Sequence, residues 1–233
     1  AHSFPTRRSS DLGDATTFTA TLSAGTHASY AWAFGDGTTG SGAAVDHSYA
    51  APGIYTATVT TRNAINVVTA TTTVIVAEGL SNLAAVSDAP TLLGEATAFT
   101  ASVATGTGVS YAWDFGDGTT DVGPGVSHTY ATPGTYIVRV TASNAVGQLT
   151  DQVTVWVGEP VTGLAAQSDS PTPLGEATVF AADVATGTDV AYLWSFGDGI
   201  TGFGADVSYS YATARPYIVR VTASNAVGQL TDQ

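Results

Sequence analysis

An aspartate between two glycines recurs three times in this chain of 233 residues, and it is the residue best placed for chemistry. The three are Asp36, Asp117 and Asp198, each within a Phe-Gly-Asp-Gly string. Calcium is the metal that such carboxylates would suit, but it takes about six to eight oxygen ligands and one aspartate per loop supplies too few. Glycine permits positive φ, and a short aspartate side chain accepts hydrogen bonds from its own turn. The pattern therefore predicts a structural turn and assigns no metal ligand, with weak calcium sites between repeats left open.

Histidine offers the second candidate chemistry. His47 and His128 fall in the apolar phase of a predicted strand, where the third copy of the segment has Tyr209, so a packing role is favoured. A serine-type triad needs a base, and no histidine is shared by all three copies. No carboxylate pair stands out for glycoside hydrolysis, and no glycine-rich loop precedes a predicted helix that would bind phosphate. The sequence thus predicts no catalytic residue and no cofactor, and a protein that is not an enzyme.

Composition excludes several partners. Six basic residues, all arginine, stand against nineteen acidic ones, for a formal net charge of −13. Nucleic acid is therefore not an expected partner, because phosphate binding requires clustered cations, and an anionic membrane surface is disfavoured for the same reason. The chain has no cysteine, which removes disulfides and thiol chemistry. No apolar run is long enough to span a bilayer, so no membrane insertion is expected.

An internal repeat organises the chain. A tryptophan stands two residues before each Phe-Gly-Asp-Gly string, at Trp32, Trp113 and Trp194, and both steps between these residue numbers are 81. In the middle copy, apolar residues alternate with polar ones through Trp113 and Phe115, the period that sends alternate side chains to one face of a sheet. Similar runs separated by Gly, Pro and Asn turns give six or seven strands over about 80 residues. We therefore predict an all-β chain of three tandem immunoglobulin-like β-sandwiches with an aromatic core.

The motifs of the middle copy resemble those of the PKD (polycystic kidney disease) domain family. They are the strings at residues 113–118 (Trp-Asp-Phe-Gly-Asp-Gly), 127–130 (Ser-His-Thr-Tyr) and 133–136 (Pro-Gly-Thr-Tyr), and they recur in order along the chain. Departures are Ala33 and Ser195 for the motif aspartate, Tyr209 for histidine, and Ala-Arg-Pro at 214–216, which puts the third corner turn in doubt. The tyrosines after the corner turn are similar to the tyrosine corner of immunoglobulin-like sandwiches. The predicted structural motif comprises Trp32, Phe34, Asp36, Tyr55, Trp113, Phe115, Asp117, Tyr136, Trp194, Phe196, Asp198 and Tyr217.

The repeat also predicts the domain boundaries. Residues 1–12 do not fit the repeat and resemble a translated sequencing adapter, so we expect them to be non-native. Repeat 1 then covers 13–78 without its first strand, repeat 2 is complete at 79–159, and repeat 3 covers 160–233 without its last strand. The chain is accordingly expected to be a fragment of a larger protein.

Short joints at residues 77–80 and 157–161 predict a semi-rigid rod, because they are too short and too apolar for a flexible tether. Together with the resemblance, this indicates an extracellular or cell-surface stalk or adhesion segment of a bacterial-type secreted or surface protein, whose neighbours are further repeats. The alternative is a set of accessory modules of a secreted hydrolase that bind polysaccharide or protein, with Trp156 as the possible platform. A weaker third hypothesis is an active site between units. Segments 38–44, 119–125 and 200–206 vary between copies, through drift or as recognition loops.

Overall fold

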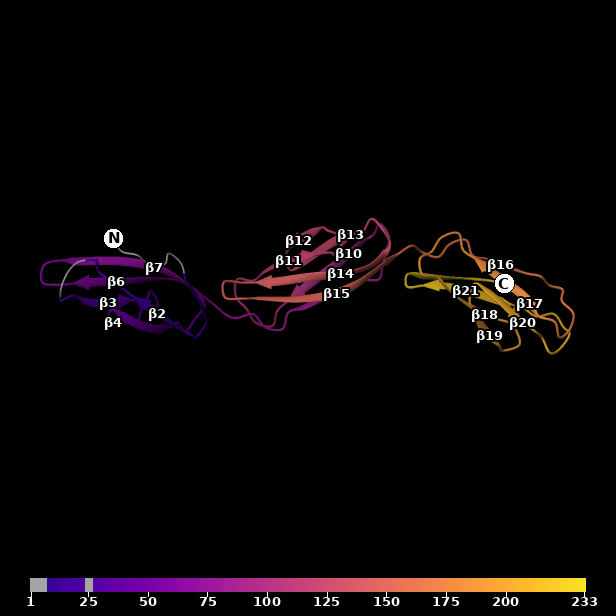
Figure 1. Cartoon of the computed structure of the whole chain (residues 1–233), viewed down its shortest axis with the longest axis horizontal. Coiled ribbons are helices and arrows are strands. Elements are labelled where there is room, and N and C mark those ends of the chain that lie inside the picture. The colour runs from indigo at the N-terminus through magenta and orange to yellow at the C-terminus, as the bar shows by residue number, and fades with distance from the viewer. Residues whose placement is uncertain (1–7, 24–26) are drawn as a thin grey trace.

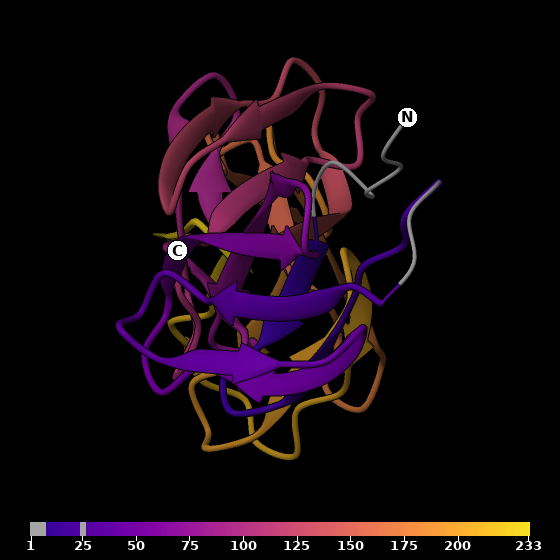
Figure 2. The same cartoon turned by 90° about the vertical axis from the view of Figure 1, so that its left-hand side faces the viewer.

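A computed structural model describes residues 8–23 and 27–233, which form strands and turns and contain no helix. Three β-sandwiches follow one another along the long axis of the molecule (Figure 1), and Figure 2 looks along that axis. Within the described residues there is accordingly no helix with the length and apolarity to cross a membrane. The predicted all-β chain of three tandem sandwiches is confirmed.

The middle unit shows the complete arrangement. One sheet has the order β13-β10-β8 and the other β12-β11-β14-β15-β9, and every pairing is antiparallel except that of β9 with β15. The strands are β8 (Ala84–Ser87), β9 (Thr91–Leu92), β10 (Ala96–Ser102), β11 (Ser110–Asp114), β12 (Thr120–Val122), β13 (Gly125–Thr129), β14 (Gly134–Ser143) and β15 (Gln148–Gly158).

The outer units repeat this topology. In the first, β2 pairs with β5, and the second sheet has the order β1-β7-β6-β3-β4; in the third, the sheets are β16-β17-β20 and β19-β18-β21-β22. The strands of the first unit are β1 (Arg8–Asp11), β2 (Ala15–Thr19), β3 (Ser29–Ala33), β4 (Thr39–Ser41), β5 (Ala44–Ser48), β6 (Gly53–Arg62) and β7 (Val67–Ala77). Those of the third are β16 (Ala165–Ser168), β17 (Thr178–Asp183), β18 (Ala191–Ser195), β19 (Thr201–Phe203), β20 (Asp206–Tyr209), β21 (Arg220–Asn225) and β22 (Gly228–Asp232).

Each sandwich has a core of its own. Trp32, Trp113 and Trp194 are 2%, 1% and 2% exposed and belong to three separate hydrophobic clusters. In the middle unit, burial alternates along β10 and β11, so the inner faces of the two sheets meet around Phe99, Trp113 and Phe115. Each indole Nε1 also donates to a backbone carbonyl ten residues later, at Gly42, Gly123 or Gly204 (2.9–3.0 Å).

Two strands of the middle unit differ from the sequence prediction. The sequence does not predict the short β9, and β12 lies within segment 119–125, for which the sequence predicts a variable loop. All three residues of β12 are exposed, so the strand shows no alternation of apolar and polar residues that could reveal it. It is the edge strand of its sheet, held by pairing with β11 alone.

The first residues that the structure describes take part in the first sandwich, although the sequence leads us to expect that residues 1–12 lie outside the repeat. Residues 8–11 form β1, which pairs in parallel with β7 as β9 pairs with β15. Pairing uses backbone groups, which any sequence supplies. The side chains fit less well: Thr97 shares a 2.6 Å hydrogen bond with Thr91, whereas the equivalent Thr16 has a buried hydroxyl without a partner in the described residues. Residues 1–7 of the adapter-like segment lie outside that description.

The third sandwich contains the first part of its last strand. β22 pairs with β21 from Gly228 to Asp232, equivalent to the start of β15, and the chain ends before the counterpart of Val153–Gly158. Residues 215–219, whose middle-unit equivalents belong to β14, form no strand. The division into repeats at 13–78, 79–159 and 160–233 stays a proposal.

Candidate functional site

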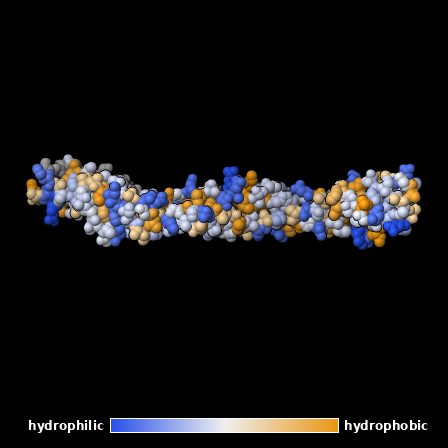
Figure 3. Space-filling model, turned by 90° about the horizontal axis from the view of Figure 1, so that it is seen from below, coloured by the Kyte–Doolittle hydropathy of each residue, from blue (hydrophilic) through white to orange (hydrophobic). Residues whose placement is uncertain are grey.

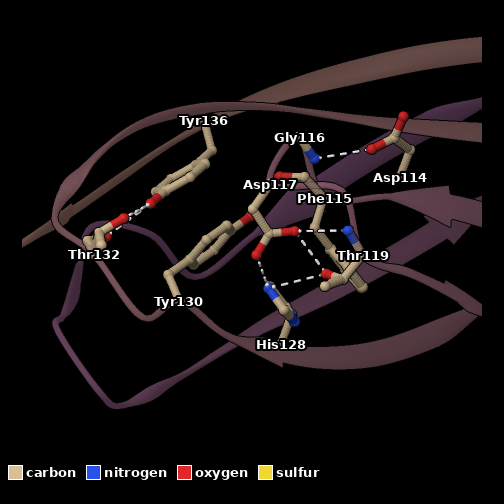
Figure 4. Close-up of polar contacts among 9 residues, drawn as sticks. All are labelled: Asp114, Phe115, Gly116, Asp117, Thr119, His128, Tyr130, Thr132 and Tyr136. Atoms are coloured by element: carbon tan, nitrogen blue, oxygen red, sulfur yellow. Dashed lines mark hydrogen bonds and ion pairs between the residues drawn. The ribbon is translucent and has the colours of Figure 1, made fainter.

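The aspartate between glycines forms a hydrogen-bonded cluster with a threonine and a histidine. In the middle unit (Figure 4), Asp117 Oδ1 accepts from Thr119 N at 3.0 Å and from Thr119 Oγ1 at 2.6 Å. Asp117 Oδ2 lies 2.6 Å from His128 Nε2, and Thr119 Oγ1 lies 3.3 Å from the same nitrogen. The turn after β11 is thereby tied to β13, a strand of the opposite sheet.

The cluster recurs with the same geometry in the first unit and with one substitution in the third. Asp36 makes the same contacts at 3.0, 2.7 and 2.7 Å with Thr38 and His47. In the third unit the Tyr209 hydroxyl donates to Asp198 Oδ2 at 2.6 Å, and Ile200 N donates to Oδ1. Histidine and tyrosine are interchangeable here because each places a donor at the edge of a planar ring.

The contacts resemble those of a catalytic triad in composition only. In a triad, histidine uses one ring nitrogen toward the carboxylate and the other toward the nucleophile. Here His128 Nε2 faces both Asp117 and Thr119, so the imidazole has no free nitrogen aimed at the hydroxyl. The ring also stacks on Phe115 with centroids 4.2 Å apart. No group of three or more metal-binding side chains occurs among the residues described. The arrangement therefore fastens a turn.

Electrostatics stabilises the ionised aspartate. Burial opposes ionisation, but hydrogen bonds from the Thr119 side chain, His128 and the Thr119 backbone outweigh it and lower the pKa of Asp117 to about 2. The same balance with Thr38 and His47 lowers the pKa of Asp36 to about 2. In the third unit, the hydrogen bond to Asp198 and then burial raise the pKa of Tyr209 to about 12.

Acid should weaken the first two sandwiches through these aspartates. Because the folded-state pKa lies below the usual 3.8, ionised Asp117 stabilises the fold above about pH 4, and this contribution is lost as the pH falls toward 2. We expect the urea midpoint of the middle unit, followed by the NMR signal of the Trp113 indole, to fall over that range. In an Asp117→Asn chain the midpoint should be lower at pH 7 and should change less between pH 4 and 2. An equal acid dependence in both chains would contradict the assignment.

Four aromatic rings form a column next to each cluster. In the middle unit Phe115 stacks on His128 (4.2 Å), His128 meets Tyr130 edge-on (4.6 Å), and Tyr130 stacks on Tyr136 (4.0 Å). The Tyr136 hydroxyl donates to Thr132 O at 2.7 Å; the equivalent bonds run from Tyr55 to Ala51 O and from Tyr217 to Thr213 O. The structure thus brings the motif phenylalanine, aspartate and tyrosine together, while the tryptophan packs in the core against Phe99.

One contact in this region was not foreseen from the sequence. The buried Tyr130 hydroxyl donates to Phe115 O at 3.1 Å, and Tyr49 and Tyr211 do the same with Phe34 and Phe196. The partners are 15 residues apart, and only the folded sandwich brings them together. The available signal was the tyrosine at a fixed place in each repeat.

The possible ligand platform does not lie on an open face. Trp156 is half-buried at the joint between the second and third units, and its Nε1 donates to Asp189 Oδ2 at 3.2 Å. Among the described residues, a large aromatic ring is exposed instead at Phe203, which is 78% exposed on the edge strand β19 and pairs in register with Leu193 of β18. Its equivalents are Val122 and Ser41, so the repeat pattern gave no signal for it.

Two sheets packed face to face, with the strand orders given above, define each unit as an immunoglobulin-like β-sandwich, and the chain as a tandem array of them. The chain belongs to the PKD domain family, whose family model matches residues 4–76, 83–157 and 163–233. The resemblance seen in the sequence is therefore confirmed for each of the three repeats.

Two comparisons give specific similarities, one in sequence and one in fold. It is 36% identical over 193 residues to human Polycystin-1, which covers 80% of this chain and 4% of that protein. It is 13% identical to the full ectodomain of mouse nectin-like molecule 4, three immunoglobulin domains, with a TM-score of 0.51 and coverage of 97% and 94% of the two chains. The second similarity shows the fold alone. PKD and immunoglobulin-like domains are typical of extracellular adhesion or spacer modules and generally serve in interactions.

Proposed function

We propose that this chain is a non-catalytic spacer segment of an extracellular or cell-surface protein that holds neighbouring domains at a distance. The observation that carries the proposal is the end-to-end arrangement of three sandwiches with separate cores (Figure 1). Each unit is fastened internally by its aspartate cluster and its aromatic column.

The joints support a spacer because they leave little free chain between units. β7 runs to Ala77 and β15 to Gly158, so the strands themselves extend to the joints. The next residue is held by the following unit: Glu78 N donates to Thr107 Oγ1 (2.8 Å), and Asn144 Nδ2 donates to Glu78 O (2.8 Å). The second joint has the same contacts among Glu159, Thr188 and Asn225.

The surface is consistent with this function. Figure 3 shows apolar residues in small separate groups along the rod, between hydrophilic ones. A net charge of −13 keeps such a chain soluble and unattractive to nucleic acid.

Small-angle X-ray scattering of the whole chain tests the proposal. Strands of 10 and 11 residues give units about 35 Å long, so three in a row form a rod of about 100 Å with a radius of gyration of about 30 Å. A compact globule of this length would have a radius of gyration of roughly 17 Å. The larger value is expected, and the smaller one would refute a spacer.

Binding of polysaccharide or protein is the second candidate function, and the exposed Phe203 favours it. Flat unburied rings are what sugar platforms use. The test is a pull-down on insoluble polysaccharides. We expect Phe203→Ala to reduce retention if the ring of Phe203 binds the sugar, and Trp156→Ala to reduce it if the ring at the joint does. Equal retention of both variants and the unaltered chain would remove this function.

A further inference from the structure

The two joints of the rod differ in three side chains that lie at equivalent positions. At the second joint these are Trp156, Gly158 and Asp189, and at the first they are Ile75, Ala77 and Gly108. The contacts that hold Glu78 and Glu159 are common to both joints. The joints also differ in the residues that follow these glutamates, 79–82 (Gly-Leu-Ser-Asn) and 160–163 (Pro-Val-Thr-Gly), but the three positions named above are those that make the side-chain contact between units.

Trp156 connects the second unit to the third through its ring. Its Nε1 donates to the carboxylate of Asp189, a residue of the third unit with φ of 51°. The far edge of the ring covers Gly158: a Cβ added there would overlap the ring atoms Cη2 and Cζ3 and come within 2.5 Å of Thr188 Oγ1. The ring therefore fits at this place because residue 158 is glycine, and Asp189 supplies the acceptor for its N–H.

The first joint lacks every one of these contacts. The Ile75 side chain has no hydrogen-bond donor, Ala77 carries the methyl group that would exclude a ring, and Gly108 has no side chain to accept a hydrogen bond. Gly108 has φ of 62°, close to the 51° of Asp189, so the backbone at this position has the same left-handed conformation in both loops.

From this comparison we infer that the second joint is locked by the Trp156–Asp189 contact and that the first joint is the hinge of the rod. The chain then consists of a stiff pair, units two and three, linked through a bending joint to unit one. Hinges are a few residues at element ends that absorb a change of direction, and the short stretch after β7 fits that description. A locked joint and a hinge add a mechanical property to the proposed spacer, and their functional significance rests on that proposal.

Distance distributions between spin labels test the inference, because a chain without cysteine accepts labels at chosen positions. Ser41, Val122 and Phe203 are equivalent exposed residues on the edge strands β4, β12 and β19. The full chain is labelled at 41 and 122 in one sample and at 122 and 203 in the other. We expect a narrow distribution for 122/203 and a broad one for 41/122, and equal widths would overturn the inference.

Variants at the joint separate the lock from a merely structural role. Asp189→Gly removes the hydrogen-bond acceptor, and glycine tolerates the positive φ at this position. The ratio of straight to bent conformers at the second joint should then fall about fivefold, which corresponds to the loss of one hydrogen bond. Asp189→Asn keeps an acceptor oxygen and should retain the narrow distribution. Asp189→Gly with an unchanged 122/203 width would overturn the lock.

The first joint offers the converse experiment. Ile75→Trp, Ala77→Gly and Gly108→Asp together install the second joint's side chains, and the 41/122 distribution should narrow. No narrowing in a folded triple variant would contradict the claim that these three positions decide stiffness. Small-angle scattering of the same samples separates a failure of the lock from a failure of the spacer. An extended chain whose two distance distributions are equally wide refutes the lock and leaves the spacer, whereas a compact globule refutes both.

Discussion

We expect Trp113→Ala to destabilise the middle sandwich strongly, to the point of unfolding it in little or no denaturant, and to leave its neighbours folded. The indole is 1% exposed, packs against Phe99 and donates to Gly123 O, so its removal leaves both a cavity and a carbonyl without its partner. Such truncations cost about 3–5 kcal/mol. A unit of about 80 residues has an unfolding free energy of roughly 4–12 kcal/mol. The cost of this one substitution is therefore comparable to the whole stability at the lower end of that range.

NMR resolves this result because each sandwich has its own core tryptophan. The indole signals of Trp32 and Trp194 should keep their folded positions and urea midpoints while the amide signals of β11 and β14 collapse. Val122→Ala, on the exposed edge of the same sheet, should change stability by less than about 0.5 kcal/mol. Simultaneous loss of the Trp32 and Trp194 signals would show that the units share one core.

Gly116→Ala has the second largest expected effect, and Gly118→Ala is its matched control. Both residues have positive φ, 79° and 91°, and either alanine is strained by about 1–2 kcal/mol. They differ in space: a Cβ at Gly116 would lie 2.7 Å from Ile137 O, whereas nothing lies within 4 Å of one at Gly118. Displacing the β14 backbone adds about 1–3 kcal/mol to the Gly116 variant only.

Chemical denaturation of the two variants gives the comparison directly. The midpoint of the middle unit should fall for both, and further for Gly116→Ala. Equal losses would mean that backbone conformation alone explains the glycines. The same close approach occurs at Gly35 and Gly197, against Thr56 O at 2.8 Å and Ile218 O at 2.5 Å, so the effect should recur in each repeat.

Much of the fold was predictable because the buried strands alternate strictly and the repeat is regular. The residues through Trp113 show one buried face, and that face packs in the core as expected. Edge strands such as β12 were missed because a fully exposed strand has no such pattern. The parallel pairing of β1 was missed because it depends on backbone groups alone.

The candidate site was predictable in its parts and not in its connections. The sequence indicated a turn role for Asp117 and a packing role for His128, and the two side chains prove to bond to each other across the sandwich. Their separation of 11 residues indicates a contact only when the two sheets are already in place. The same holds for Trp156 and Asp189, whose contact depends on how consecutive units meet.

Pulling the chain from its two ends tests most directly whether it consists of three independent sandwiches. Each unit releases about 66–81 residues, so three separate unfolding events, each lengthening the chain by about 190–250 Å, are expected. The third unit should unfold at the lowest force, because its last strand, β22, has 5 residues where the equivalent β15 of the middle unit has 11. A single event that releases the whole chain at once would contradict separate cores, and the spacer with them.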